Sequence, residues 1–71
     1  MDYDYSKLIG KIKEVFGTQA AFAEAMGMGE STLSLKLNNK AEWSQEEMSK
    51  AMILLGIDHG EVKAYFFTHI V

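Results

Sequence analysis

The polar residues between positions 30 and 40 have the chemistry to recognise double-stranded DNA. On a helix with 3.6 residues per turn, Leu33 and Leu37 lie on one face. Ser31, Leu35 and Asn38 then point in the opposite direction. Hydroxyl and amide groups can bind base edges or phosphate oxygens, and an exposed leucine can contact the methyl group of thymine. The outward face of this segment therefore suits a DNA major groove, and the less favoured alternative is an ordinary solvated face.

Two charged residues of the same segment, Glu30 and Lys36, could also contact DNA. Glu30 can accept a hydrogen bond from the amino group of cytosine. It can also be simply a favourable acid in the first turn of a helix. Lys36 is expected to lay its stem along the edge of the core and to send its amine towards a phosphate.

Two short helices joined by a tight turn would hold these residues in position for DNA. Thr18 is expected to cap the N-terminus of a helix over 19–26. This helix is expected to bury Phe22, Ala23 and Met26. Gly27 lies in the turn, and a second helix runs from about 30 to 39. This arrangement is a helix-turn-helix, in which the second helix packs on the first and still offers an outer surface.

Three further helices complete the predicted fold. Apolar residues at i, i+4, i+7 and i+8 predict a helix over 7–16. These residues are Leu8, Ile12, Val15 and Phe16. Ser6 or Asp4 is expected to cap the start of this helix, and Gly17 is expected to end it. Ser44 and Glu47 predict a capping box that opens a fourth helix before Gly56, whose inward residues are Met48, Ala51, Met52 and Leu55. Asp58 is expected to cap a short fifth helix with Val62, Tyr65 and Phe66. The expected fold is all-α, a compact five-helix bundle in a single domain over residues 1–71.

Residues 18–40, TQAAFAEAMGMGESTLSLKLNNK, resemble the helix-turn-helix of phage repressors and Cro proteins. AMGMGES in particular is similar to the turn of lambda repressor, and a looser resemblance extends to about Tyr65. The resemblance implies a lambda-repressor-like DNA-binding domain and a phage or prophage transcriptional regulator. It also implies that Gln19 touches the DNA backbone. The chain departs from the family at two positions, because the family often has glutamine at the position of Glu30 and an apolar residue at that of Lys36.

The expected partner is therefore an operator in double-stranded DNA, with the helix over 30–39 in the major groove. Residues expected to clamp the DNA backbone or to face its bases are Thr18, Gln19, Glu30, Ser31, Thr32, Ser34, Leu35, Lys36, Asn38 and Lys40. No cofactor and no small-molecule ligand are expected.

Catalysis and membrane insertion are not expected. The chain has no cysteine, and its two histidines, His59 and His69, have no carboxylate at the spacing of metal ligands. The fragment Gly27-Met28-Gly29 follows no strand and has no lysine after it, unlike a phosphate-binding loop. Apolar runs are much shorter than the roughly 20 residues that cross a bilayer. The expectation is a protein of the bacterial cytoplasm, without a metal site.

The charge of the chain favours a second function of a different class. Its net charge is −3, with five carboxylates against one lysine over residues 41–61. The chain has seven lysine and arginine residues, all of them lysine, so the bidentate contact of arginine with guanine is unavailable. The alternative is an antirepressor-like protein-interaction module that keeps the bundle but does not bind DNA.

The C-terminal residues YFFTHIV are apolar for an end exposed to water. They either complete the core beneath the first and fifth helices or form a self-complementary patch. The second possibility predicts a homodimer, because paired recognition helices reach two half-sites about 34 Å apart. The residues expected at such a dimer contact are Phe67, Ile70 and Val71.

Overall fold

A computed structural model describes residues 2–70, and within them all regular elements are helices. In chain order they are α1 (Ser6–Phe16), α2 (Gln19–Met26), α3 (Glu30–Leu37), α4 (Gln45–Leu55), the 3-10 helix η1 (His59–Glu61) and α5 (Val62–Phe66). The all-α fold class and the helix-turn-helix, formed by α2 and α3, are confirmed. None of the helices in this range is long and apolar enough to span a membrane.

The helices begin and end at the residues whose chemistry favours it. The Thr18 hydroxyl accepts a hydrogen bond from the backbone N–H of Ala21 at 3.1 Å, and α2 ends at Gly27, whose φ is +76°. At the start of α4, the Ser44 side chain accepts from the Glu47 backbone and the Glu47 side chain accepts from the Ser44 backbone. The predicted bounds of α2 and the capping box of α4 are therefore confirmed.

One predicted helix end and the predicted caps of two helices are wrong. α3 ends at Leu37 rather than 39, because Asn39 adopts the left-handed conformation, with a φ of +62°. Asp58 precedes η1 without a side-chain capping hydrogen bond, so its predicted role as a cap is not fulfilled. At the N-terminus, Asp4 accepts a hydrogen bond from the backbone N–H of Ser6, but the N-cap position of α1 is Tyr5, which makes no side-chain capping hydrogen bond, so neither expected residue is the cap.

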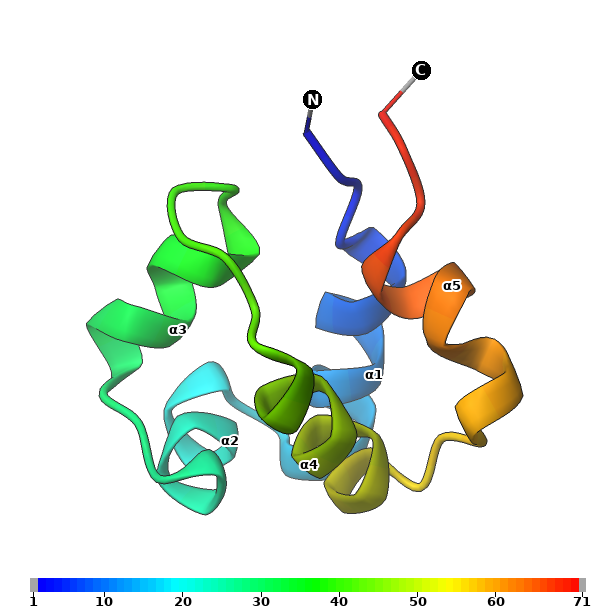
Figure 1. The fold of residues 1–71 in the computed structure, drawn as a ribbon. Coiled ribbons are helices and arrows are strands. Elements are labelled where there is room, and N and C mark those ends of the chain that lie inside the picture. Colours follow the sequence, from blue (N-terminus) through cyan, green and yellow to red (C-terminus); the bar gives the residue numbers. More distant parts are fainter. Residues whose placement is uncertain (1, 71) are drawn as a thin grey trace.

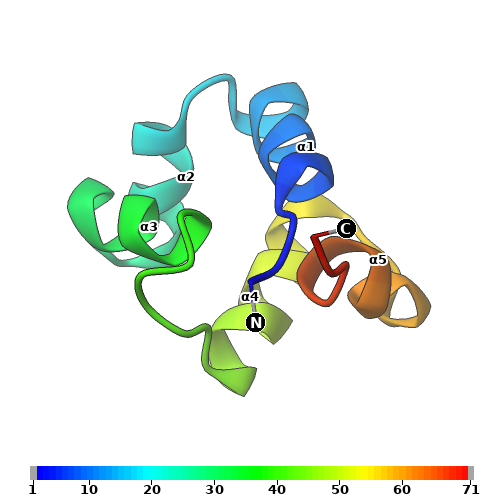
Figure 2. The ribbon, with the colours of Figure 1, turned by 90° about the horizontal axis from the view of Figure 1, so that it is seen from above.

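The core lies where the five helices meet. Figures 1 and 2 show α2 and α3 on one side, α1 and α5 on the other, and α4 packed against both groups. The largest fully buried side chains of the core are Leu8, Ile12, Phe22, Leu33, Met52 and Phe66. Val15 was expected in the core but is 45% exposed, because it lies in the last turn of α1, where Phe16 makes the contact with Phe22 instead.

The segment over residues 2–5 and the segment over residues 67–70 lie side by side (Figure 1), and the first of them is also bound to the residue that follows Asn38 at the end of α3. Tyr3 and His69 form an antiparallel bridge, and the Asp4 N–H donates to the Thr68 carbonyl at 2.6 Å. The Asn39 carboxamide accepts from the Tyr3 N–H and donates to the Tyr3 carbonyl, both at 2.9 Å. One amide side chain thus holds the N-terminal segment against the helix-turn-helix.

Candidate functional site

The outward face of α3 lies as the helical spacing predicts. Leu33 and Leu37 are buried, whereas Leu35 is 49% exposed. Seven other residues that were expected to contact DNA are exposed as well: Thr18, Gln19, Glu30, Ser31, Thr32, Asn38 and Lys40. Ser34 is half-buried. All of the predicted site residues are therefore at least partly accessible to solvent, with one exception.

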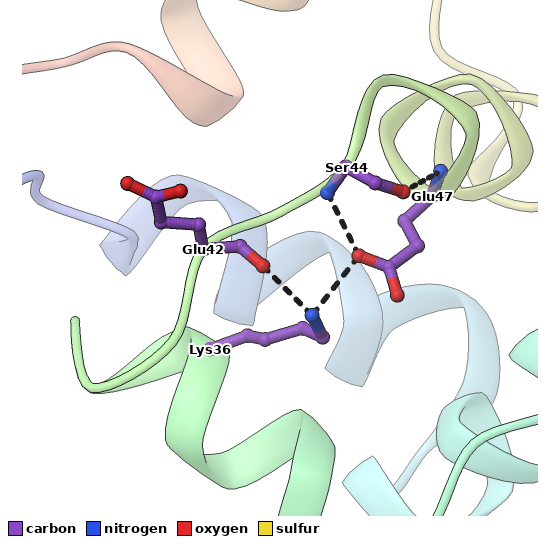
Figure 3. Close-up of polar contacts among 4 residues, drawn as sticks. All are labelled: Lys36, Glu42, Ser44 and Glu47. Atoms are coloured by element: carbon purple, nitrogen blue, oxygen red, sulfur yellow. Dashed lines mark hydrogen bonds and ion pairs between the residues drawn. The ribbon is translucent and has the colours of Figure 1, made fainter.

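Lys36 is that exception, and the prediction that its amine reaches a phosphate is wrong. The residue is only 8% exposed. Its Nζ donates to the backbone carbonyl of Glu42 at 2.7 Å and forms an ion pair with Glu47 Oε1 at 3.0 Å (Figure 3). Position 36 lies beside the buried face of α3, so the amine meets the following loop and the start of α4 rather than the solvent.

The Glu47 carboxylate joins the capping box to this ion pair. Its Oε1 accepts from the backbone N–H of Ser44 at 2.8 Å as well as from Lys36 (Figure 3). Partial burial raises the pKa of Glu47, but the Ser44 hydrogen bonds and the Lys36 ammonium outweigh it, so the pKa lies below its usual value. Glu47 is therefore a charged partner of Lys36 at neutral pH.

Side chains at the end of α3 make contacts within the protein. Asn38 Nδ2 donates to the carbonyl of Ser34 at 2.8 Å, which turns this amide back onto its own helix. Asn39 binds the Tyr3 backbone and was missed by the sequence interpretation. Its only local signal is that asparagine tolerates a left-handed conformation better than most residues.

A hollow of about 450 Å³ lies between the segment that follows α3 and the two ends of the chain. Its lining is mixed, with charged residues beside aromatic ones: Asp2, Tyr3, Tyr5, Asn39, Lys40, Ala41, Glu42, Trp43, Met48, Phe66 and Phe67. We call this feature the terminal hollow. Two other hollows, of about 100 and 320 Å³, have smaller volumes.

Aromatic rings packed edge to face give the terminal hollow its shape. The ring centroids of Tyr3 and Phe67 are 5.8 Å apart, and those of Trp43 and Phe66 are 5.2 Å apart. Trp43 is partly buried and packs against the core. Its buried Nε1 has no hydrogen-bond partner among the described residues.

The C-terminal residues divide between the core and the surface. Tyr65 and Phe66 are buried, whereas Phe67 is 39% and Ile70 58% exposed. Core completion, one of the two expected possibilities, is thus met by the first two residues. Val71 lies outside the described residues, and the homodimer stays a prediction.

Comparisons with known proteins show the family of this chain. Residues 1–69 match the model of a family described as "Protein of unknown function (DUF739)". The chain belongs to the DUF739 family. No curated protein matches this DUF739 member. Among solved structures, it is similar to the solution structure of the modulator of repression (MOR) of the temperate bacteriophage TP901-1 from Lactococcus lactis. The two are 51% identical, with a TM-score of 0.82, over 94% of this chain and 90% of the other.

These findings correct two expectations drawn from the sequence. The assignment to the phage repressor and Cro family is wrong, because the chain is a DUF739 protein that is similar to a modulator of repression. The expected sequence-specific binding of operator DNA is wrong for the same reason, and the findings favour the antirepressor-like alternative. The helix-turn-helix of this DUF739 protein is a structural feature that does not by itself make it a DNA-binding repressor.

Proposed function

We propose that this protein is an antirepressor-like regulator, which modulates a phage repressor by binding the repressor protein. The observation that carries the proposal is the 51% identity with the modulator of repression of bacteriophage TP901-1, over nearly the whole of both chains. Identity of this degree over a shared fold favours a shared type of partner. The partner is accordingly a protein that itself binds DNA.

The charges of the chain support a protein partner. A DNA-binding surface gains most of its affinity from cations that neutralise phosphates. Here Lys36 is buried in an ion pair, and the neighbouring residues Glu42 and Glu46 are exposed acids. An acidic edge of this kind suits a repressor, whose own DNA-binding surface must be basic.

The terminal hollow is the contact surface that best fits such a partner. Protein interfaces are enriched in aromatic residues at their centre and polar at their rim. The hollow has Tyr3, Trp43 and Phe67 in its lining, and Asp2 and Glu42 lie among them. Phe67 and Ile70 leave apolar surface exposed at this end of the molecule. We therefore assign this surface to the repressor.

Isothermal titration calorimetry against the purified repressor from the genome that carries this gene tests the proposal. We expect a saturable complex, and an about tenfold or larger loss of affinity in Phe67→Ala, because a central aromatic side chain carries much of an interface. Ile53→Ala is the matched control, since Ile53 is an exposed apolar residue of α4 that does not line the hollow. We expect this variant to bind within about twofold of the wild type.

One result would overturn the proposed function, and a second would overturn the assignment of its contact surface. The first is the absence of any complex at concentrations where the repressor occupies its operator. The second is a complex that forms equally well with Phe67→Ala and with Ile53→Ala, which would remove the terminal hollow from the interface. Circular dichroism of both variants shows that a loss of affinity is not a loss of folding.

A further inference from the structure

One wall of the terminal hollow has few hydrogen bonds of its own. Lys40, Ala41, Glu42 and Trp43 link α3 to the residue that caps α4 and contribute to the lining of the hollow. Lys40 donates its N–H to the Leu35 carbonyl at 2.8 Å. For the backbone of 41–43, the contact from Lys36 Nζ to the Glu42 carbonyl is the only hydrogen bond among the described residues. A short segment bound at so few points depends strongly on each of them.

The Lys36 amine binds this segment and the start of α4 at once. It donates to the Glu42 carbonyl at 2.7 Å and pairs with Glu47 Oε1 at 3.0 Å. The same oxygen atom accepts from the Ser44 N–H at 2.8 Å. Figure 3 shows the amine between the loop and the first turn of α4. Lys36 therefore fixes residues on both sides of Trp43, whose own backbone makes no hydrogen bond among the described residues.

We propose that Lys36 is a positioning residue for repressor binding, which holds the 40–43 wall of the terminal hollow in the shape that the partner contacts. The inference rests on the proposed function and adds a specific residue to it. Lys36 does not touch the repressor, because only 8% of its surface is exposed. It acts through the Glu42 carbonyl and through Trp43, which packs on Phe66 at the base of the same wall.

The ion pair between the buried Lys36 and the partly exposed Glu47 is explained better by positioning than by stability. Replacing a buried ion pair by apolar side chains of similar volume is often neutral or stabilising. An apolar residue at position 36 could complete the packing of α3 against α4, but it could not bind the Glu42 carbonyl. The amine lowers the number of conformations open to the segment before the partner arrives, and such preorganisation increases affinity.

Lys36→Met tests the proposal, since methionine keeps most of the apolar stem and removes the amine. We expect cooperative unfolding to persist and the affinity for the repressor to fall about tenfold, which corresponds to the ordering of one or two side chains on binding. Lys13→Met is the matched control, because Lys13 is an exposed lysine of α1 that does not line the hollow. Its affinity should stay within about twofold of the wild type.

A spectroscopic readout separates positioning from a general loss of stability. The chain has a single tryptophan, so one indole ¹⁵N–¹H resonance reports on the wall of the hollow. In free Lys36→Met we expect this resonance to shift or to broaden, while resonances of core residues far from the wall keep their wild-type positions. Lys13→Met should leave the indole resonance unchanged.

Glu47→Gln provides a second test that does not depend on the folding of Lys36→Met. Glutamine can still serve in a capping box, so α4 keeps its start while the ion pair loses its charge. We expect a smaller loss of affinity, of about two- to fivefold. Glu24→Gln, the same change at an exposed residue of α2 that does not line the hollow, should bind the repressor within about twofold of the wild type.

The possible outcomes distinguish this inference from the proposed function. If the wild-type protein binds the repressor, and Lys36→Met binds as tightly with an unchanged indole resonance, the positioning role is refuted and the function stands. If Glu47→Gln and Glu24→Gln lose affinity equally, the effect is one of overall charge, and the positioning role is again refuted. If the wild-type protein forms no complex, the proposed function itself fails.

Discussion

Asn39 offers a direct test of how the N-terminal segment is held. Its carboxamide makes two hydrogen bonds to the Tyr3 backbone, 36 residues away, each at 2.9 Å. It also has a φ of +62°, a conformation that costs most other residues about 1–2 kcal/mol. Asn39 therefore contributes to stability in two separable ways, through its side chain and through its backbone.

Replacement by glycine removes only the first contribution, and replacement by alanine removes both. Two neutral hydrogen bonds contribute about 1–3 kcal/mol together, so we expect Asn39→Gly to lower the free energy of unfolding by that amount. Asn39→Ala should be lower by about a further 1 kcal/mol or more, because alanine must adopt the left-handed conformation. In a domain of this size, 1 kcal/mol corresponds to a shift of about 4–8 °C in Tm.

Urea denaturation followed by circular dichroism gives these differences, with Asn38→Gly as the control. Asn38 precedes Asn39, is exposed, and bonds only within its own helix, so the control contains the entropic cost of glycine without the contact to Tyr3. Amide exchange at Tyr3 is the second readout, and Asn39→Gly should increase its rate. Equal stabilities for Asn39→Gly and Asn38→Gly, with Tyr3 still protected, would refute the reasoning.

Three further predictions concern the core, the start of α4 and acid pH. Leu33→Ala should lower the free energy of unfolding by about 2–5 kcal/mol in urea denaturation, because Leu33 is fully buried; a loss below 1 kcal/mol would contradict this. Ser44→Ala should cost about 1 kcal/mol in the same assay, as the loss of an N-cap, whereas Ser49→Ala should be nearly neutral. The pKa of Glu47 lies below its usual value, so its contribution to stability is present above the pKa of the unfolded chain and is lost as the pH falls through the folded pKa. The free energy of unfolding of Glu47→Gln should therefore fall less than that of the wild type as the pH is lowered below about 4.5. Parallel dependences of this free energy on pH in the two proteins would contradict the role of Glu47.

Local signals predicted most of the helices. The bounds of α2 could be found because Thr18 and Gly27 specify its two ends through their own chemistry. Ser44 and Glu47 fix the start of α4 in the same way, by two hydrogen bonds within four residues. Such signals depend on neighbours in the chain, so the sequence alone contains them.

Contacts between distant residues account for what could not be predicted. Apolar spacing placed Val15 on the buried face of α1, but it does not tell how far the neighbouring helices extend along that face. The acceptor of Lys36 depends on the path of the loop after α3, and the terminal hollow depends on the pairing of Tyr3 with His69. A sequence pattern specifies which face of a helix is apolar, but not which polar atoms meet across the fold.

The mistaken inference of DNA binding has a related cause. The residues that made the chain resemble a repressor, such as Ala23, Gly27 and Leu33, are ones that pack or turn the helix-turn-helix. They specify how α3 packs on α2, and any protein with this fold needs them whatever it binds. The exposed residues Ser31 and Leu35 fit more than one partner, because hydroxyl groups and an aliphatic side chain occur at protein surfaces of every kind. Charge distinguishes the alternatives better, since binding to phosphates requires free cations close to the exposed helix. Here Lys36 is withdrawn into an ion pair, and Glu42 and Glu46 follow it at the surface. The charge that follows α3, rather than the spacing of the residues that build the motif, is therefore the feature of this chain that supports the proposed protein partner.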